Sequence, residues 1–541
     1  MKYQLSLHYS AFMAVIKAQG TQEQVEKWYT ASERHAIIGC YAQTELRSLL
    51  SIVLILQQAA KWWIGGLGVA STHAVVQAQL MIAGKSYGPH LFIVPIRSPL
   101  DLKPCKGVQI GDIGPKAYGG FSTVDNGFAL FDHVRIPREN MLMKFAKVTP
   151  EGRYVPPVHN KLSYGSMVKL RVDIVGDAGW TLAKAVTIAI RYCTVRRQFN
   201  INKHDGLETQ VISYSSVQHR LMPLLATAYG LIITGKSLYN QFTQLLEQLE
   251  TNDTTLLPEI HVTSCALKSW GTRCSTDGME ECRKSMGGHG YSVFSGISGL
   301  FATSVPSNTY EGDNYVLSQQ VARFLLKQLQ LVAKGKPVTG STAEYLMLLN
   351  QHMTVEHILD PQVQLGLFGL RAARLVADLA QQLQSGRAWS DLNMECWAVN
   401  LAHAEYLILK ELIGQLKALT STQYAPLYPI MKSISDMVIM GTFLSTSTIL
   451  PSDLGKLNEA YRACMATISI NAIALVDSFG FTDTELGSAL GRYDGRAYEA
   501  LWEATQKNPV NHGPDHIKLN NVVLEILHRG NNLEYLQSAK L

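Results

Sequence analysis

Hydrophobic residues recur at helical spacing through most of the chain after residue 163. Residues 173–192 form one amphipathic run, and two further apolar stripes predict helices at 368–383 and 397–419. Stripes of this kind usually face a protein core, so we interpret them as packing surfaces rather than as cofactor contacts. A linker is expected at 334–342, where glycine, proline and small polar residues separate two helical runs.

Residues 61–145 show a different pattern, with short apolar runs between turn residues. Residues 90–96 are typical of a buried strand, and 128–136 predict a pair of strands. Ahead of this part, residues 1–45 predict helices followed by a turn into a strand-like piece. The pattern therefore indicates a β part near the N-terminus and a longer helical part after it.

The composition fits a soluble globular protein of two to four domains. The 541 residues are 47% hydrophobic and 17% charged, which argues against disorder. A net charge of +5 is small for this length and gives no support for a nucleic-acid partner, which usually needs a concentrated basic face. The N-terminus lacks the layout of a signal peptide, and the longest apolar run, 49–56, is too short for a membrane span.

The eight cysteines are scattered along the chain. They form no Cys-x-x-Cys pair and are accompanied by no paired histidines. We therefore expect free, buried thiols, and neither a disulfide framework nor a metal site.

Two motifs resemble nucleotide-binding loops. Residues 230–237, GLIITGKS, match the P-loop pattern letter for letter, but a working P-loop needs a preceding strand, and the flanks here predict one long helix. Residues 66–68 begin a dinucleotide-binding fingerprint and have Ser71 where its third glycine belongs. Neither motif supports a nucleotide site.

The densest candidate chemistry lies between residues 287 and 325. It begins with GGHGY at 287–291, crosses small polar residues that predict a loop, and reaches YEGDN at 310–314. A helix is predicted next, and its apolar face would carry Val316, Val321, Phe324 and Leu325.

Glu311 stands at this loop-to-helix junction, among small residues. A carboxylate at such a place can reach into a cleft and act as a general base, for which geometry matters first and a tuned pKa second. The alternative is that Glu311 is only an acidic residue beside the positive end of the helix dipole. The residues of the junction alone leave both interpretations open.

Several blocks resemble one family in letter and order. They are GGHGY, YEGDN with the following VARFL, DHVRIPRENML at 132–142, YAQTE at 41–45 and LGSALGRYDG at 486–495. The set resembles acyl-CoA oxidases, the peroxisomal branch of the acyl-CoA dehydrogenase superfamily, over nearly the whole chain. The resemblance implies that Glu311 removes the α-proton of an acyl-CoA thioester.

The resemblance also implies FAD as cofactor and names residues that would bind it. Thr44 would bond the edge of the flavin ring, and Gly65 would let the backbone approach the cofactor because it has no Cβ. Arg196 would reach flavin phosphates from a neighbouring subunit, since a guanidinium suits phosphate, although a helix-terminal arginine is commonly only solvated. Gly287 and Gly288 are implied as further cofactor contacts.

Two features depart from the family pattern. Residues 46–60 stand where the family has a Gly-rich loop, and this segment is shorter than expected. The family also has a helical portion before the point that corresponds to Met1, so residues 1–45 are expected to be an incomplete N-terminal piece. An acyl-CoA dehydrogenase and a non-catalytic relative therefore stay open as alternatives to an active oxidase.

The implied fold is α+β, mostly helical and acyl-CoA dehydrogenase-like. After the N-terminal piece come a β-barrel-like domain, a middle helical domain for flavin and acyl-CoA and, beyond the linker, a C-terminal helical bundle. The corresponding ranges are 1–45, 46–160, 161–333 and 343–541.

The implied activity is that of an oxidoreductase in fatty acid metabolism. It would oxidise acyl-CoA to trans-2-enoyl-CoA, with O2 reduced to H2O2, as the first step of peroxisomal β-oxidation. A homodimer is also implied. The terminal residues Ala539, Lys540 and Leu541 are a close variant of the Ser-Lys-Leu address that the peroxisomal import receptor reads.

Overall fold

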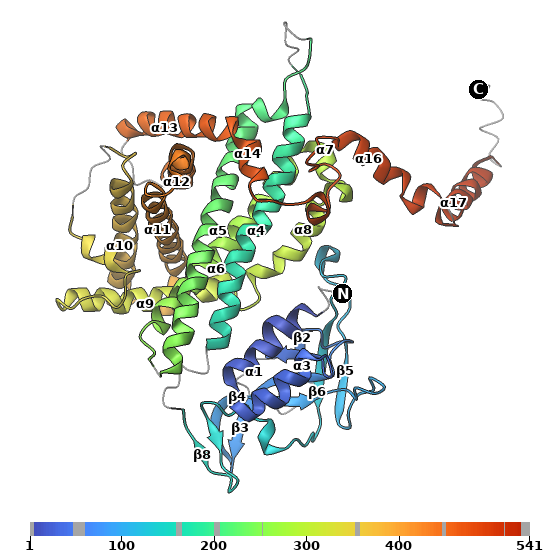
Figure 1. The fold of residues 1–541 in the computed structure, drawn as a ribbon, viewed down its shortest axis with the longest axis vertical. Coiled ribbons are helices and arrows are strands. Elements are labelled where there is room, and N and C mark those ends of the chain that lie inside the picture. The colour runs from blue at the N-terminus through green and yellow to red at the C-terminus, as the bar shows by residue number, and fades with distance from the viewer. Residues whose placement is uncertain are drawn as a thin grey trace.

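The protein consists of a β part near the N-terminus and a larger helical part (Figure 1). The computed structural model describes residues 5–46, 60–157, 165–199, 206–251, 253–351, 357–445, 451–512 and 514–531. The altered segment 46–60 lies outside the described residues except for its two ends, and so do the last residues, 532–541.

Two three-stranded sheets make up most of the β part. Their strand orders are β1-β3-β4 and β2-β6-β5, and β1 pairs with β3 in parallel whereas the other pairs are antiparallel. The strands are β1 (Gly39–Ala42), β2 (Lys61–Gly65), β3 (His73–Ile82), β4 (Lys85–Pro95), β5 (Val108–Asp112) and β6 (Asn126–Phe131). A short hairpin of β7 (Lys147–Val148) and β8 (Tyr154–Val155) follows.

Alternation along β3 and β4 gives the first sheet two apolar faces. Val76 and Val94 belong to a core cluster shared with the second sheet, whereas Val75 and Ile93 belong to a cluster on the opposite face. The two sheets therefore pack against each other through the first of these faces.

The N-terminal helices cover the other face of the first sheet. They include η1 (His8–Met13), α1 (Ala14–Gln19), α2 (Gln22–Gln24), η2 (Val25–Tyr29) and α3 (Thr30–Glu33). Phe12 and Ile16, both fully buried, pack against Val75 and Ile93 in this layer. The predicted order of helices before a strand is confirmed.

The expectation of barrel-like closure is wrong. Within the described residues the strands form two open sheets and a hairpin, with no closed barrel. The predicted strand pair at 128–136 is only the end of β6, because His133 adopts a left-handed φ of 50° that a strand cannot continue through. The wider expectation, an α+β, mostly helical fold of the acyl-CoA dehydrogenase type, is confirmed by the similarity to solved structures given below.

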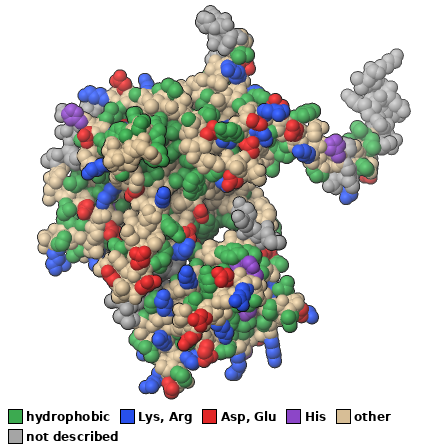
Figure 2. Space-filling view, in the orientation of Figure 1, with side chains coloured by type: hydrophobic (Ala, Val, Ile, Leu, Met, Phe, Trp, Pro, Cys, Tyr) green, Lys and Arg blue, Asp and Glu red, His purple; other side chains and the backbone are tan. Residues whose placement is uncertain are grey.

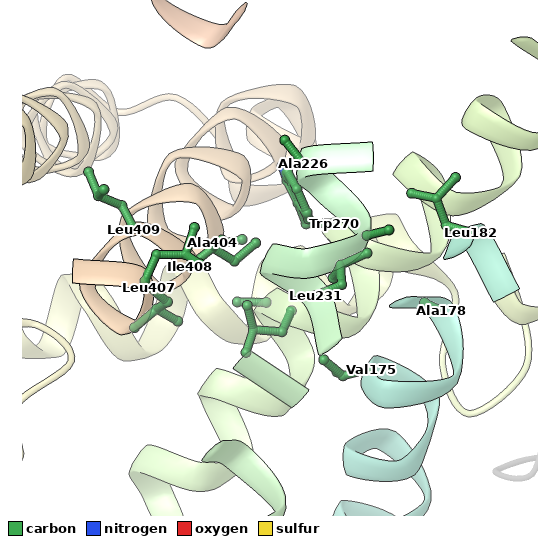
Figure 3. Packing of buried hydrophobic residues seen from close by; sticks show 14 of the residues in the cluster. Val175, Ala178, Leu182, Ala226, Leu231, Trp270, Ala404, Leu407, Ile408 and Leu409 are labelled. Atoms are coloured by element: carbon green, nitrogen blue, oxygen red, sulfur yellow. The ribbon is translucent and has the colours of Figure 1, made fainter. Parts of the chain in front are cut away.

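Four long helices form the centre of the helical part. They are α4 (Gly165–Val195), α5 (Ser215–Glu250), α6 (Leu257–Ser285) and α9 (Asn314–Ala333). One face of α5 packs on α4 and α6, and other faces pack on α11 (Asn393–Leu419) and α12 (Tyr428–Ser445). Figure 3 shows side chains of this cluster, among them Val175 of α4, Leu231 of α5, Trp270 of α6 and Ile408 of α11.

The P-loop pattern at 230–237 lies inside α5, as its flanks predict, and its glycines serve helix packing. A Cβ on Gly235 would lie 2.9 Å from Cα of Gly176 in α4, and one on Gly230 would lie 3.2 Å from the side chain of Ile408. Small residues are needed at both crossings.

The same helix is long and apolar enough to cross a membrane by length and composition alone. Of its most apolar window, 56% is buried inside the structure, as in the core helix of a globular protein. This is weak evidence for a span, and the packing on four neighbouring helices accounts for the apolar residues.

Residues 334–342 lie between α9 and η10 (Glu344–Leu348). Beyond this linker lie α10 (Pro361–Gln384), α11, α12, α13 (Pro451–Ile470), α14 (Ala472–Asp477) and α15 (Asp483–Leu486). One continuous apolar cluster includes residues from both sides of the linker. The linker therefore separates two runs of helices along the sequence, while a single hydrophobic core contains residues from both runs.

The last two helices extend away from the body as an arm (Figure 1). They are α16 (Ala497–Gln506) and α17 (Pro514–Asn531). Large apolar side chains are exposed on the arm, including Trp502 at 68% and Ile526 at 62%. Figure 2 shows hydrophobic side chains along it.

Candidate active site

A cavity of about 1470 Å³ lies between the β part and the helices. Pockets for one small ligand typically measure roughly 300–1,000 Å³, so this cavity has room for a large ligand or for two. Figure 2 shows the surface hollowed between the two parts. Among the lining residues are Leu7, Thr44, Trp63, Gly65, Arg171, Asp177, Trp180, Lys236, Tyr239, Tyr310 and Glu311.

Glu311 lies at the turn that leads into α9, as predicted. Its φ is 55° and that of Gly312 is 109°, so two successive residues are left-handed. For a non-glycine residue this conformation costs about 1–3 kcal/mol and persists only where surrounding groups hold it. Asp313 then caps α9 by accepting hydrogen bonds from the amides of Tyr315 and Val316, at 2.9 and 3.3 Å.

The predicted apolar face of α9 is confirmed at Val321 and Leu325, which are buried, and at the half-buried Phe324, and it is wrong at Val316. Val316 is 53% exposed, whereas Leu317, Val321 and Leu325, spaced four residues apart, are buried. The predicted loop before the turn also contains a helix, α8 (Ile297–Ser304). Its apolar residues Ile297 and Ala302 are buried, a packing contribution that the small polar residues around them concealed.

Two cations hold the turn from two different helices. Nε of Arg171, in α4, donates to the main-chain oxygen of Glu311 at 2.9 Å. Nζ of Lys268, in α6, donates to the main-chain oxygen of Gly312 at 2.7 Å and to Oδ1 of Asn314 at 2.9 Å. These bonds fix both carbonyl groups of the strained turn.

The carboxylate of Glu311 is partly buried, and its Oε2 has no hydrogen-bond partner among the described residues. Burial raises the pKa of this carboxyl, and the positive charges of Arg171 and Lys268 oppose the rise. A carboxylate that is desolvated and not hydrogen-bonded is a stronger base than one in water. The site therefore combines a basic oxygen with a cavity in which a substrate can lie.

Two tyrosines next to Glu311 stay neutral at physiological pH. Burial, followed by the charges of Asp177 and Glu311, raises the pKa of Tyr310 to about 12. Burial, with a smaller contribution from Glu311, also raises the pKa of Tyr41 well above its usual value. Glu311 is therefore the group of these three whose proton can be exchanged.

Thr44 lies on the cavity wall at the end of β1, with its side chain exposed. Its main-chain oxygen accepts from the amide of Trp62 at 2.9 Å. The neighbouring Lys61 is almost fully buried and donates to Glu45 at 2.8 Å and to the main-chain oxygen of Gln43 at 3.2 Å. These bonds fix the strand end and leave the hydroxyl of Thr44 free to face the cavity.

The same bonds show how the altered segment is anchored. The amide of Leu46 donates to the main-chain oxygen of Ala60 at 2.9 Å, and Glu45 bridges to Lys61. The described ends of the segment that replaces the Gly-rich loop therefore lie side by side, which makes it a connection between neighbouring strands.

Gly65 also lines the cavity, and its close neighbour is a side chain. A Cβ at this position would lie 2.2 Å from Cδ1 of Leu7. The absence of a Cβ therefore admits Leu7 in this structure, a contact that the sequence reasoning did not foresee.

Arg196, Gly287 and Gly288 do not line this cavity. Arg196 follows the last residue of α4, and the two glycines begin the short helix α7 (Gly287–Gly290). The hydroxyl of Tyr192 and Nδ1 of His289, 3.0 Å apart, link these two elements. A Cβ on Gly287 or Gly288 would meet nothing within 4 Å, so this second surface is open.

The sequence reasoning missed Arg171, Lys268 and Trp63. The two cations stand within long helical runs, where charged residues normally face solvent, and nothing local marks them as buried. Trp63 lines the cavity with a left-handed φ of 67°. It lies beside Gly65 and Gly66, a run of small residues that could have signalled a strained backbone there.

The described cysteines are all free, as expected. Among the parts of the chain that the structure describes, no group of three or more His, Cys, Asp or Glu residues could hold a metal ion.

Three family models match the chain. The model described as "Acyl-CoA oxidase, C-alpha1 domain" matches residues 164–326, "Acyl-CoA oxidase" matches 360–528, and "Acyl-coenzyme A oxidase N-terminal" matches 2–38. Peroxisomal acyl-coenzyme A oxidase 1 of Arabidopsis thaliana is 41% identical over 548 residues, which cover 94% of this chain and 82% of that protein. The chain belongs to the acyl-CoA oxidase family.

Other members of the family extend this result. Peroxisomal acyl-coenzyme A oxidase 1 of Rattus norvegicus is 39% identical, over 94% of this chain and 82% of its own length. The solved structure of Arabidopsis thaliana acyl-CoA oxidase 1 is similar with a TM-score of 0.87 at 41% identity, covering 94% of this chain and 83% of that one.

A second solved structure carries ligands. Acyl-CoA oxidase-2 of Caenorhabditis elegans, bound with FAD, ascaroside-CoA and ATP, is similar with a TM-score of 0.89 at 31% identity, covering 97% of this chain and 83% of that one. The acyl-CoA oxidase fold expected from the sequence is thus confirmed across both the β part and the helical part.

Proposed function

We propose that Glu311 is the general base of this acyl-CoA oxidase. The enzyme oxidises an acyl-CoA to the trans-2-enoyl-CoA, with O2 reduced to H2O2, in peroxisomal fatty acid β-oxidation. The observation that carries the assignment is the carboxylate of Glu311 on the wall of the 1470 Å³ cavity, with Oε2 buried and unpaired.

The cavity fits FAD together with an acyl thioester. Its volume exceeds that of a pocket for one small ligand, and Thr44, Gly65 and Glu311 line it together. The hydroxyl of Thr44 and the backbone at Gly65 would contact the flavin ring. When bound, FAD supplies the hydride acceptor for the β-hydrogen and passes the electrons to O2.

The protein residues supply the proton transfer. Glu311 accepts the α-proton of the thioester, and its unpaired Oε2 is the atom available for it. Arg171 and Lys268 bind main-chain oxygens of the turn, so neither cation occupies the carboxylate. The left-handed turn thereby directs the base into the cavity, and the side chain of Asp313 caps the N-terminus of α9.

Glu311→Gln tests this role. The amide cannot accept the α-proton, so peroxide production should fall by about a thousandfold or more while FAD stays bound. Peroxide output is measured with a coupled peroxidase assay, and flavin content by absorbance. Near-normal output from Glu311→Gln would refute the assignment. The exposed residue Glu459, changed to Gln, is the matched control and should keep full activity.

The two alternatives are separated by simple measurements. A dehydrogenase would reduce an acceptor dye and produce little peroxide, whereas an oxidase produces peroxide in air. A non-catalytic relative would be colourless and well folded after purification. The names of the relatives favour the oxidase over both.

The second surface supports the proposal of a homodimer. Arg196, Gly287 and Gly288 lie off the cavity of their own chain, which suits residues that contact the FAD phosphates of a second copy. A guanidinium binds phosphate through two parallel hydrogen bonds. The exposed apolar residues of α16 and α17 provide surface that a second copy can bury.

Mixed dimers test this arrangement. Glu311→Gln and Arg196→Gln are each expected to impair activity as homodimers. In a mixed dimer one site carries both changes and the other carries neither, so co-expression should restore part of the activity. No recovery in purified mixed dimers would reject a site shared between copies.

We also propose that the import receptor recognises Ala539, Lys540 and Leu541. The tripeptide differs from Ser-Lys-Leu only at its first position. These residues lie outside the described part of the chain.

A further inference from the structure

Lys268 is a buried cation whose hydrogen bonds go to neutral groups. None of its side chain is exposed, and its two acceptors are the main-chain oxygen of Gly312 and the amide oxygen of Asn314. An ammonium group loses much of its hydration on burial, and neutral acceptors replace that loss only in part. Such a residue is costly for folding alone, which suggests a second role.

Its position relative to the base suggests that role. Lys268 holds the carbonyl of Gly312, and Arg171 holds the preceding carbonyl, of Glu311. Both residues of this turn are left-handed, so their conformation depends on such outside contacts. Lys268 thus acts on the carboxylate of Glu311 indirectly, through its hydrogen bond to the backbone of the turn and through its charge.

Asn314 extends the support to α6 and to the loop before the turn. Its Nδ2 donates to Oγ1 of Thr272 and to Oδ1 of Asn308, both at 3.0 Å. Its Oδ1 accepts from Lys268 at 2.9 Å. The lysine is therefore part of a connected polar network, and a change of side chain there is transmitted to the turn.

Charged and titratable groups face Lys268 from every element packed against it. Lys268 faces Arg171 of α4, Cys265 of α6, and Glu311 and Asp313 of the turn. Burial, followed by Arg171, lowers the pKa of Lys268 to about 8, so it is charged at neutral pH.

The groups facing Glu311 are Arg171 and Lys268 on the cationic side, with Tyr41 and Tyr310 as neutral phenols. Two cations therefore oppose the effect of burial on the base.

We propose that Lys268 is a positioning residue for the base: it fixes the Gly312 carbonyl, and its charge favours the ionised form of the Glu311 carboxylate without bonding to it. The proposal rests on the assigned role of Glu311. A carboxylate held in this way keeps a free oxygen for the α-proton. A salt bridge directly to the carboxylate would give the charge but occupy that oxygen.

The test uses Lys268→Met and Lys268→Gln in the FAD-loaded enzyme, with the exposed residue Lys327, changed to Met, as the control. Methionine removes both the charge and the donor, while glutamine removes the charge and keeps a donor. The rate kcat for peroxide production is measured across pH, together with KM, flavin content and thermal melting.

Loss of the cation makes the ionised carboxylate less favourable, so the pKa of Glu311 rises. The acid limb of the kcat profile should move to higher pH by about one unit in both variants. In Lys268→Met, kcat at its optimum should also fall by about tenfold to a hundredfold, with KM changed by less than about threefold, because the turn is looser. Lys268→Gln should recover part of this optimum rate. Lys327→Met should match the wild type in every measurement.

An unchanged acid limb in both variants would overturn the proposal, even if the rates fall. Loss of folding or of flavin in both variants would overturn it as well, since Lys268 would then be needed for assembly. Glu311→Gln is run in parallel and separates the two hypotheses. If that variant stays active, the base itself is misassigned; if it is inactive and the Lys268 variants are normal, only the role of Lys268 fails.

Discussion

Arg171 donates from Nε to the main-chain oxygen of Glu311 at 2.9 Å, across 140 positions of sequence. A second donor of the same side chain, Nη1, donates to Sγ of Cys265 at 3.7 Å. Arg171 as a residue is only 7% exposed, so its side chain joins α4, α6 and the turn before α9 inside the protein. The conformation of the base is thus set by a residue from a distant helix.

Arg171→Lys should weaken this link. Lysine has a single ammonium on a flexible stem and cannot reproduce the forked geometry of the guanidinium. A buried carbonyl left without its donor costs about 1–3 kcal/mol of stability. A base displaced by up to about 1 Å from its working position loses about tenfold to a hundredfold in rate. Denaturant unfolding and kcat measure the two effects.

The matched control is Arg374→Lys, which changes an exposed arginine of α10. It should leave both quantities unchanged. Wild-type kcat in Arg171→Lys would mean that the turn holds its conformation without the arginine.

The sequence leaves two explanations for why position 65, in β2, is a glycine. The family resemblance implies that a glycine there admits the cofactor, whereas the structure places Cδ1 of Leu7 2.2 Å from the position of a Cβ. Gly65→Ala should therefore destabilise the protein by about 1–3 kcal/mol through overpacking against Leu7. Denaturant unfolding gives the size of this effect.

The double variant Gly65→Ala/Leu7→Ala decides between the explanations. It should recover most of the stability lost in Gly65→Ala, because the side chain that clashes is gone. If FAD content recovers as well, the glycine serves helix packing. If stability recovers and FAD content stays low, the glycine serves the cofactor, as the family resemblance implies.

Much of the fold follows from local pattern. The apolar stripes at 368–383 and 397–419 became α10 and α11, and the breakers at 334–342 became the loop after α9, because each signal lies within one element. The junction at Glu311 was also visible, since Gly312 and Asp313 are typical of a turn and a helix cap. The P-loop pattern was correctly set aside because its flanks were helical.

Features that depend on contacts between distant segments could not be predicted from the sequence. Lys268 and Arg171 look like ordinary charged residues of long helices, and only their packing against the turn reveals their use. In α9 only the first predicted core position was wrong, because Val316 and Leu317 are both apolar and tertiary packing alone chooses between them. The open sheets differ from the expected barrel because strand closure depends on pairing between distant strands.

The proposed peroxisomal address that ends at Leu541 gives a prediction in cells. Removing this one residue deletes the terminal carboxylate-bearing leucine of the Ala-Lys-Leu tripeptide, so the import receptor should no longer bind. The truncated enzyme should accumulate in the cytosol, as judged by fractionation or imaging. Replacing Ala539 with Ser creates the standard tripeptide and should retain or improve import. Unchanged import of the truncated chain would reject the address.

The unpaired carboxylate of Glu311 predicts a dependence of stability on pH. Burial raises its pKa in the folded state above that of the unfolded chain. Between the two pKa values the folded state therefore binds more protons than the unfolded state. The wild type loses stability as pH rises through this interval, until the folded-state pKa is passed. Glutamine does not ionise, so Glu311→Gln should be more stable than the wild type.

This gain should appear as pH rises through the pKa of the carboxyl in the unfolded chain, level off above the raised folded-state pKa, and shrink toward zero in more acidic solution, where the carboxyl is protonated in both states. Melting temperatures of the two FAD-loaded proteins, without substrate, measure it. Glu459→Gln, on the exposed face of α13, should show no comparable trend. A Glu311→Gln protein that is less stable than the wild type at about pH 8 would mean that the ionised carboxylate gains more from Arg171 and Lys268 than it loses by burial.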